Sequence, residues 1–259
     1  MANYDILGNI AILKFPDKTS KAEKLRQAQE VMKTHPSVET ILEKMEKVSG
    51  RLRTIKTKHI IGKKNLVAEY HECGCRFKLK VDSCYFSPRL ANERLEIARL
   101  IAKMKNPNVL VMFAGVGPFS IIIAKNSKTK KIVSIELGKE CCKYAQENVI
   151  LNKVDNFVEV LQGDVKKVVR KLKEKFDVIV MPRPNLKDTF LKSALSVARK
   201  NTKIIYYGFS AESKLQKMLA DLHKESKSAR RKIKITNIKE AGDIAPYEHR
   251  YRIEMTVLN

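Results

Sequence analysis

From residue 108 onward, short apolar runs alternate with segments in which apolar residues recur every three or four positions. Runs of the first kind are typical of strands buried on both faces, and the second spacing is typical of helices that cover a sheet. The alternation predicts strands over 109–113, 131–137, 157–162, 176–181 and 202–208, and helices over 118–126, 139–151, 164–173, 187–199 and 211–224. Two last strands, 232–240 and 249–258, have no helix between them and should form an antiparallel hairpin at one sheet edge. The pattern therefore predicts an α/β fold with a doubly wound, Rossmann-like seven-stranded sheet and a ligand crevice at the carboxyl ends of its strands.

The first part of the chain has a different pattern. We expect residues 1–80 to form a small α+β domain and residues 81–259 to form the sheet domain. Within the small domain we predict a strand or hairpin over 1–17, a helix over 21–34 capped by Ser20, a short helix over 38–48 and a basic extended segment over 51–80. A further helix, with an apolar stripe from Leu95 to Met104, leads into the sheet.

The join between the first predicted strand and its helix carries the clearest chemistry. It contains Gly115-Val116-Gly117, a tight glycine turn of the kind that lets a nucleotide approach the backbone, although Ser120 stands where a third glycine would complete a dinucleotide motif. The second strand ends at Glu136, where a carboxylate can hold a ribose diol.

Two more strand ends extend this series. The third strand is followed by Gly163-Asp164 and the fourth by Met181-Pro182-Arg183-Pro184. A glycine turn, a ribose acid, a Gly-Asp pair and a proline-bearing strand end, in that order, resemble the S-adenosylmethionine methyltransferases of class I. The resemblance implies S-adenosylmethionine as the cofactor.

Charge narrows the class of partner. The 52 Lys and Arg residues exceed the 28 Asp and Glu residues, for a formal net charge of +24 over 259 residues. An excess of this size favours a polyanion, with nucleic acid first. Genome bias or heat adaptation is the competing explanation, but such compositions normally add Glu together with Lys.

Other classes of protein are disfavoured. No apolar run approaches the roughly 18 residues that span a bilayer, so we expect no membrane association and a cytoplasmic location. Neither the cysteines nor the histidines show the spacing of metal ligands, so we expect free thiols and no metal. These residues are Cys73, Cys75, Cys84, Cys141, Cys142, His35, His59, His71, His223 and His249.

Two longer segments, 85–94 and 112–120, closely resemble the archaeal and eukaryotic tRNA (guanine-N1)-methyltransferases that modify the guanosine 3′ to the anticodon. The opening, Tyr4 to Ile12, is similar to the start of that family's second domain, and the resemblance runs from residue 4 to the end. It implies the anticodon region of tRNA as partner and N1-methylguanosine as product. We also expect a monomer.

Three departures from the family pattern indicate a divergent archaeal subgroup. The family's first, tRNA-elbow-sensing domain is expected to be missing, Val111 replaces a usual acid, and Pro182 replaces the usual asparagine of the strand-four motif. Some members of this subgroup also methylate carbon 7 of a tricyclic wyosine precursor at the same nucleotide. An aminocarboxypropyl transferase of the wyosine pathway and a catalytically silent tRNA-binding homologue are the alternative interpretations.

Methylation of guanine N1 needs a base for the N1 proton and a cation or N–H donor near O6. The resemblance implies Glu93 as the base and Arg53 as the O6-stabilising residue. Glu93 can instead be a first-turn acid that interacts with the helix dipole, and Arg53 one of several phosphate-binding cations.

The expected cofactor contacts come from five segments of the chain. They are Tyr85, Phe86, Arg89, Phe113, Gly115, Gly117, Glu136, Leu137, Asp164, Val165 and Pro182. Three of these residues have an alternative interpretation. Phe86 can instead pack in the core, Asp164 can be the N-cap of a helix, and Glu136 can be an acid at a strand end without a ligand.

Four further features have two interpretations each. Arg183 contacts either RNA or only solvent, and the Tyr206-Tyr207 pair fits a buried strand better than a stacking platform. The basic run 224–234 is either a phosphate track or a solvated loop, and Tyr247 can stack on an unpaired base.

Overall fold

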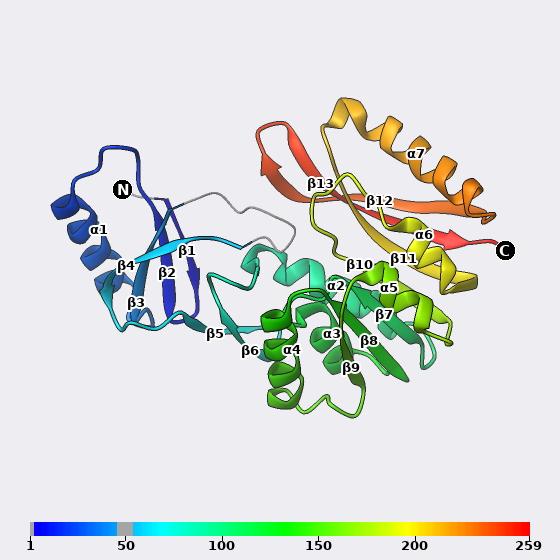
Figure 1. Ribbon diagram of the computed structural model, residues 1–259, viewed down its shortest axis with the longest axis horizontal. Helices are drawn as coiled ribbons and strands as arrows, with labels where there is room; N and C mark the ends of the chain where they lie inside the picture. The colour runs from blue at the N-terminus through cyan, green and yellow to red at the C-terminus, as the bar shows by residue number, and fades with distance from the viewer. Residues whose placement is uncertain (1–2, 46–53) are drawn as a thin grey trace.

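A seven-stranded sheet forms the larger part of the computed structural model, which describes residues 3–45 and 54–259 (Figure 1). Its strands are β7 (Asn108–Met112), β8 (Lys131–Glu136), β9 (Val158–Gln162), β10 (Phe176–Met181), β11 (Ala198–Ser210), β12 (Ile233–Ala245) and β13 (Glu248–Val257). The strand order is β12-β13-β11-β10-β7-β8-β9, and β13 is antiparallel to both of its neighbours. The predicted α/β fold and the terminal hairpin at one sheet edge are confirmed.

Helices cover both faces of this sheet. They are α2 (Ala91–Ala102), α3 (Pro118–Asn126), α4 (Lys139–Leu151), α5 (Val165–Val168), α6 (Leu191–Ser196) and α7 (Leu215–Ser228), with 3₁₀ turns η1 (Pro88–Leu90), η2 (Val169–Lys171) and η3 (Glu212–Lys214). Alternate strand residues enter different cores: Leu110 and Met112 pack with α6 and α7, whereas Val109 and Val111 pack with α2 and α3. This period of two is the strand periodicity expected for a sheet buried on both sides.

Two predicted helices are too long. The helix expected over 164–173 is one turn of α-helix followed by a 3₁₀ turn, and the helix expected over 187–199 is reduced to α6. Phe190 has a φ of 59°, which no helix interior accommodates, and from Ala198 the chain is already in β11. Residues 182–190 therefore form a loop at the end of β10 instead of the first turn of a helix.

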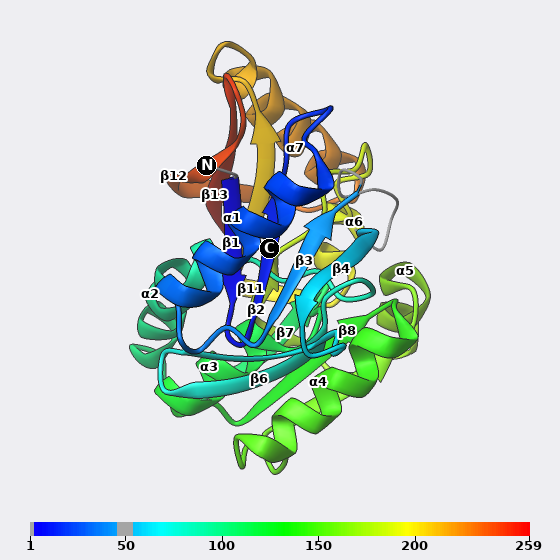
Figure 2. The same cartoon turned by 90° about the vertical axis from the view of Figure 1, so that its left-hand side faces the viewer.

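The small N-terminal domain is a four-stranded sheet with one helix (Figure 2). It contains β1 (Asn3–Leu7), β2 (Ile10–Lys14), α1 (Lys21–Thr34), β3 (Thr40–Lys44) and β4 (Thr57–Gly62), in the sheet order β1-β2-β3-β4. The predicted hairpin and the helix over 21–34 are confirmed, and the Ser20 hydroxyl accepts the Glu23 amide as an N-cap.

The short helix predicted over 38–48 is wrong in its described part. Residues 40–44 are strand β3, which pairs in parallel with β2 after the α1 crossover. Ile41 is buried among residues of α1, while its neighbour Leu42 is buried on the opposite face of the sheet. Adjacent apolar residues that point to opposite faces are typical of a strand and not of a helix. Residues 46–48 lie outside the described residues.

A separate hairpin, β5 (Val67–Glu72) and β6 (Cys75–Lys80), lies against α4. The Asn148 side chain accepts the Lys78 amide at 2.7 Å and donates to the Lys78 carbonyl at 3.0 Å. Asn152 makes the matching pair of bonds with the backbone of Arg76. Because these bonds tie β6 to the sheet domain, we propose that the boundary of the small domain precedes β5, earlier than residue 80.

We predict that Asn148→Leu lowers the free energy of unfolding by about 2–4 kcal/mol. The Asn148 side chain is fully buried and also donates to the Val116 carbonyl, so leucine leaves three backbone groups without partners. Urea denaturation measures the change. Glu147→Gln, an exposed neighbour on the same helix, is the control and should stay within about 0.5 kcal/mol of wild type. Equal stability of the two variants would contradict the docking role of Asn148.

Candidate active site

A pocket with about 680 Å³ of empty space, part of it open to solvent, lies at the carboxyl ends of the central strands. The loops after β7, β8 and β10 contribute to it, as do the starts of α4 and α5 and the segment before α2. The lining residues are Tyr85, Phe113, Gly115, Glu136, Leu137, Cys141, Val165, Pro182, Pro184 and Leu186. This is the position at which doubly wound sheets bind their ligands.

Seven of the eleven residues predicted to contact a cofactor line this pocket: Tyr85, Phe113, Gly115, Glu136, Leu137, Val165 and Pro182. Three lining residues were missed. Pro184 and Leu186 follow Pro182 in the same loop, and Cys141 lies in the first turn of the helix after Glu136. The position of that helix start, a few residues after Glu136, is the signal that could have identified Cys141.

The other four predicted contacts are not among the lining residues, and each has a structural role. Phe86 packs edge-on against Tyr70 in the core, at 5.2 Å between ring centroids. Arg89 is largely exposed and pairs with Asp5 of the small domain at 2.7 Å. Gly117 is the N-cap of α3, and Asp164 is the N-cap of α5, where its carboxylate accepts the Lys166 amide at 2.8 Å.

Glu136, the last residue of β8, connects this strand to the glycine loop that follows β7. Its Oε2 accepts the Gly115 amide and its Oε1 accepts the Gly138 amide, each at 2.8 Å. Gly115 has a φ of +58°, a conformation that favours glycine. The turn therefore presents an amide to the carboxylate and fixes its orientation at the pocket wall.

Two strained phenylalanines face one another beside this carboxylate. Phe113 and Phe190 have φ angles of 64° and 59°, and their rings meet edge to face at 4.9 Å. Positive φ in a non-glycine residue costs about 1–3 kcal/mol and gathers at ligand sites. The contact joins the loop after β7 to the loop after β10.

Arg183 is a buried residue that supports the loop of residues 182–190, which follows β10. Its Nη1 donates to the carbonyls of Pro184 and Leu186 at 3.0 Å each and to that of Asp188 at 3.2 Å. Its guanidinium also lies 5.1 Å from the Tyr206 ring centroid. Neither an RNA contact nor a solvated arginine describes this side chain, which holds Pro182, Pro184 and Leu186 in the pocket wall.

We predict that Arg183→Met lowers the free energy of unfolding by about 2–4 kcal/mol and weakens cofactor binding. Three carbonyls lose their donor, and the loop that carries Pro182 and Leu186 loses its support. Chemical denaturation and calorimetric titration with S-adenosylmethionine measure the two effects. Arg199→Met, at an exposed ion pair with Asp177, is the control. Wild-type cofactor affinity in Arg183→Met would contradict the supporting role.

Glu93 lies near the start of α2 and is almost completely buried. Its Oε1 accepts the Tyr207 hydroxyl at 2.8 Å and Nη1 of Arg252 at 2.9 Å. In the parallel ladder Met181 pairs with Tyr206, so Tyr207 comes level with Pro182 at the carboxyl edge of the sheet. Glu93 is therefore at the same edge as the pocket. Arg53, its predicted partner, lies outside the described residues.

Two other predicted features are in the core. Val111 is fully buried in β7. Tyr206 and Tyr207 are buried as expected, although the Tyr207 hydroxyl has the further contact with Glu93. The cysteines at 73, 75, 84, 141 and 142 are free thiols.

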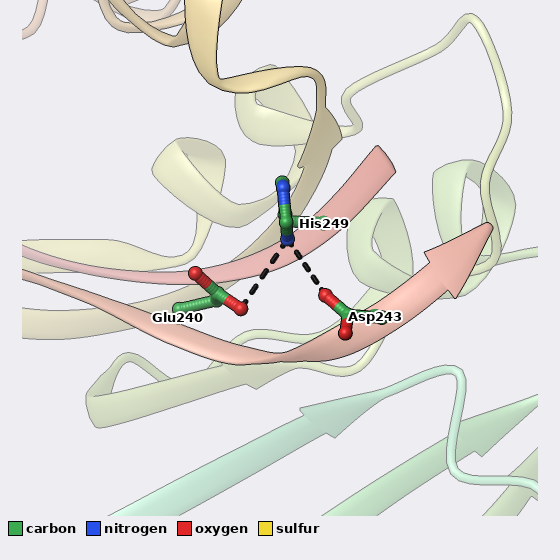
Figure 3. A group of neighbouring side chains, drawn as sticks. All are labelled: Glu240, Asp243 and His249. Carbon is green, nitrogen blue, oxygen red and sulfur yellow. Dashed lines mark hydrogen bonds and ion pairs between the residues drawn. The ribbon is translucent and has the colours of Figure 1, made fainter. Parts of the chain in front are cut away.

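His249 is not isolated in space. Its Nδ1 lies 2.7 Å from an Asp243 oxygen and 3.3 Å from a Glu240 oxygen across the β12–β13 hairpin (Figure 3). The hydrogen bond with Asp243 raises the pKa of His249, with the charge of Glu240 adding to it. A proton on Nδ1 shared with these carboxylates accounts for the arrangement, which the sequence spacing did not reveal because a β-bulge sets the register.

Among the helices described, none has the length and apolar character needed to cross a bilayer.

Comparisons with known proteins match both parts of the chain. Residues 68–235 match the family model described as the TRM5/TYW2 methyltransferase domain, and residues 1–65 match the TYW2 N-terminal domain. The chain is 37% identical over 211 residues to tRNA (guanine(37)-N(1))-methyltransferase Trm5b of Pyrococcus abyssi, covering 81% of this chain and 61% of that protein. The crystal structure of that organism's Trm5b superposes with a TM-score of 0.86 at 31% identity, over 99% of this chain and 75% of the other.

A second relative matches end to end. The tRNA (guanine(37)-N(1))/4-demethylwyosine(37)-methyltransferase Taw22 of Nanoarchaeum equitans is 31% identical over 306 aligned residues, covering 99% of this chain and 100% of that protein. The resemblance found in the sequence, including its wyosine-pathway character, is thereby confirmed. The chain belongs to the TRM5/TYW2 methyltransferase family.

Proposed function

We propose that the protein is an S-adenosylmethionine-dependent tRNA methyltransferase that acts on the guanosine 3′ to the anticodon. Its product is N1-methylguanosine, the C7-methylated wyosine precursor, or both. The observation that carries this proposal is the likeness to Taw22 over the whole of that protein, whose name combines the two activities. The arrangement of Glu136 and Glu93 at one sheet edge supports it.

The pocket suits the proposed cofactor, which supplies a methyl group on a sulfonium. A carboxylate accepts about four hydrogen bonds. The amides of Gly115 and Gly138 use two of these positions on Glu136, so acceptor capacity remains for the two ribose hydroxyls. Apolar side chains of Leu137, Val165 and Leu186 complete a surface on which a purine can lie. Asp164 at the adenine end and Arg89 at the methionine end remain predictions.

Glu93 is the proposed base. When the methyl group bonds to guanine N1, the carbon–sulfur bond breaks, its electron pair stays on sulfur, and the N1 proton passes to Glu93. Both described hydrogen bonds to this carboxylate end on Oε1, and Oε2 makes none with the described residues. Oε2 is thus the oxygen we assign to the proton. Arg53 remains the proposed cation near O6, where negative charge develops.

The motif at the end of β10, Met181-Pro182-Arg183-Pro184, indicates which kind of atom on the base accepts the methyl group. An asparagine or aspartate before the prolines accepts a hydrogen bond from a reacting exocyclic amine, and Pro182 has no such side chain. Its place in the pocket wall favours a ring nitrogen or ring carbon as the methyl acceptor.

The surface chemistry fits an RNA partner. A net charge of +24 favours phosphate contacts, and the basic run 224–234 spans the end of α7 and the start of β12. Tyr247, at the tip of the β12–β13 hairpin, is 87% exposed and able to stack on an unpaired base. A monomer remains our expectation for the enzyme alone.

Incubation with S-adenosylmethionine and two substrates, an unmodified tRNA transcript and tRNA carrying the tricyclic precursor, followed by nucleoside mass spectrometry, tests the proposal. The expected result is the mass of one methyl group replacing hydrogen on guanosine, on the precursor, or on both. The mass of an aminocarboxypropyl group would establish the alternative transferase. No new mass on either substrate, with no cofactor bound, would indicate a silent homologue.

A further inference from the structure

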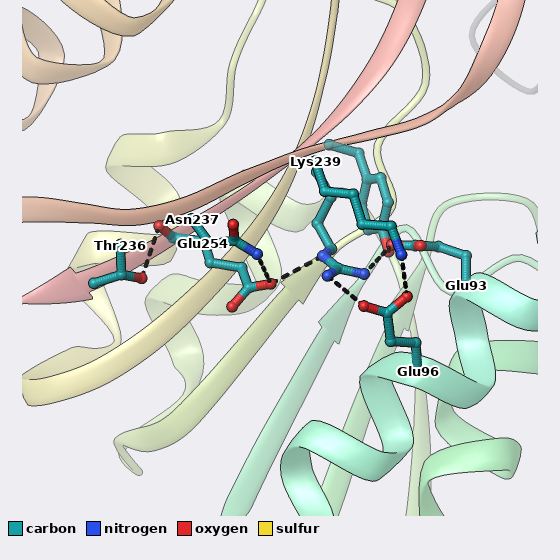
Figure 4. A network of polar contacts seen from close by, with 8 residues as sticks. Glu93, Glu96, Thr236, Asn237, Lys239 and Glu254 are labelled. Atoms are coloured by element: carbon teal, nitrogen blue, oxygen red, sulfur yellow. Dashed lines mark hydrogen bonds and ion pairs between the residues drawn. The ribbon is translucent and has the colours of Figure 1, made fainter.

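Three side chains form a row across the edge of the sheet above α2. Arg252 of β13 pairs in register with Tyr207 of β11 on one side and with Lys239 of β12 on the other. Residues directly opposite in a sheet point to the same face. Glu93 and Glu96, one helical turn apart on α2, meet this row (Figure 4).

The guanidinium of Arg252 is bonded through all three of its nitrogens. Nη1 donates to Glu93 at 2.9 Å, Nη2 to Glu96 at 2.7 Å and Nε to Glu254 at 3.0 Å. The Lys239 ammonium pairs with Glu96, and the Tyr207 hydroxyl donates to Glu93 at 2.8 Å. The Arg252 side chain is only 2% exposed, so this planar fork is fixed in a single orientation.

The surroundings favour the ionised forms of Arg252 and Glu96 and the neutral hydroxyl of Tyr207. Burial opposes the charge of Arg252, but hydrogen bonds to Glu96 and Glu93 outweigh it and raise the pKa of the guanidinium. The hydrogen bonds that Glu96 accepts from Arg252 and from Lys239 lower the pKa of Glu96 to about 2. Burial, followed by the charge of Glu93, raises the pKa of Tyr207 well above its ordinary value, so its hydroxyl remains a donor.

A structural role explains this cluster poorly. Buried ion pairs contribute little net stability, because the cost of removing the charges from water offsets their attraction. Apolar side chains of similar volume would join α2 to the hairpin equally well. The cluster instead directs two donors onto one oxygen of a single carboxylate and leaves the other oxygen without a described partner.

We propose that Arg252 and Tyr207 are positioning residues, which hold the Glu93 carboxylate oriented so that Oε2 faces the methyl acceptor. This inference rests on the proposed function, because it assigns a task to the proposed base. Neither residue touches the reacting atoms. Both act by fixing Oε1, and they come from strands 114 and 159 residues away from Glu93 in the sequence.

The test compares Tyr207→Phe, Arg252→Met and Arg252→Lys with wild type and Arg199→Met, an arginine in an exposed ion pair. Steady-state kinetics give kcat and the KM values for tRNA and S-adenosylmethionine. We expect kcat to fall about 10-fold in Tyr207→Phe and about 10²-fold in Arg252→Met, with both KM values near wild type. Arg252→Lys keeps the positive charge beside Glu93 and should restore part of the kcat that Arg252→Met loses.

The outcomes separate two failures. A wild-type enzyme that transfers no methyl group overturns the proposed function and this inference with it. If wild type is active and Glu93→Gln is not, an unchanged kcat in folded Tyr207→Phe and Arg252→Met overturns the inference alone. Tyr207→Phe removes one oxygen and keeps the ring, so it decides the question if Arg252→Met does not fold.

Discussion

Replacement of Glu93 by glutamine is expected to lower kcat by about 10²-fold or more. The amide keeps the shape of the side chain but does not take the N1 proton, so the loss falls on the chemical step. S-adenosylmethionine affinity should stay near wild type, because Glu93 does not line the cofactor pocket. Single-turnover methyl transfer and calorimetric titration measure the two quantities.

A matched control separates base catalysis from a helix-dipole effect. Glu140 is also a first-turn acid, at the start of α4, and Glu140→Gln removes a dipole interaction of the same kind. It should leave turnover within about two-fold of wild type. Wild-type turnover in folded Glu93→Gln would disprove the base assignment and favour a purely structural carboxylate.

The second large effect is expected at Glu136. Alanine at this position should raise the Kd for S-adenosylmethionine by about 10²-fold or more, since two charge-assisted hydrogen bonds to the ribose are lost. The amides of Gly115 and Gly138 also lose the acceptor that fixes the glycine loop. Calorimetric titration gives the Kd directly.

Ligand-linked stability provides a second readout of the same variant. A cofactor at a hundred times its Kd stabilises the wild type by about 2.7 kcal/mol, and the variant should show little of this at the same concentration. Glu159→Gln, on the neighbouring strand but paired with Lys131 outside the pocket, is the control. Equal affinities in Glu136→Ala and wild type would show that the cofactor binds elsewhere.

The pocket could be predicted from the sequence because the residues that line it lie close in sequence to the ends of the strands. The glycine loop follows directly after β7, and Glu136 is the last residue of β8. The fold then brings the ends of parallel strands to one edge. Local order along the chain is therefore enough to place seven of the expected residues in one pocket.

Long-range contacts could not be predicted in this way. Nothing near Glu93 in the sequence indicates Tyr207 or Arg252, because the three meet only through the register of β11 and β13. Arg183 looked like a surface residue, yet its partners are carbonyls of its own loop. The apolar pair Ile41-Leu42 fitted a helix until pairing with β2 placed its members on opposite faces.

The most direct test of the central claim locates the methyl group on the RNA. The wild-type protein, S-adenosylmethionine carrying an isotopically labelled methyl group, and a tRNA with guanosine 3′ to the anticodon are incubated together, and the ribonuclease fragments are analysed by mass spectrometry. We predict the label in the anticodon-loop fragment, at that nucleotide, and none when adenosine replaces the guanosine. Label at any other nucleotide, or cofactor binding without any label in the RNA, would contradict the assignment.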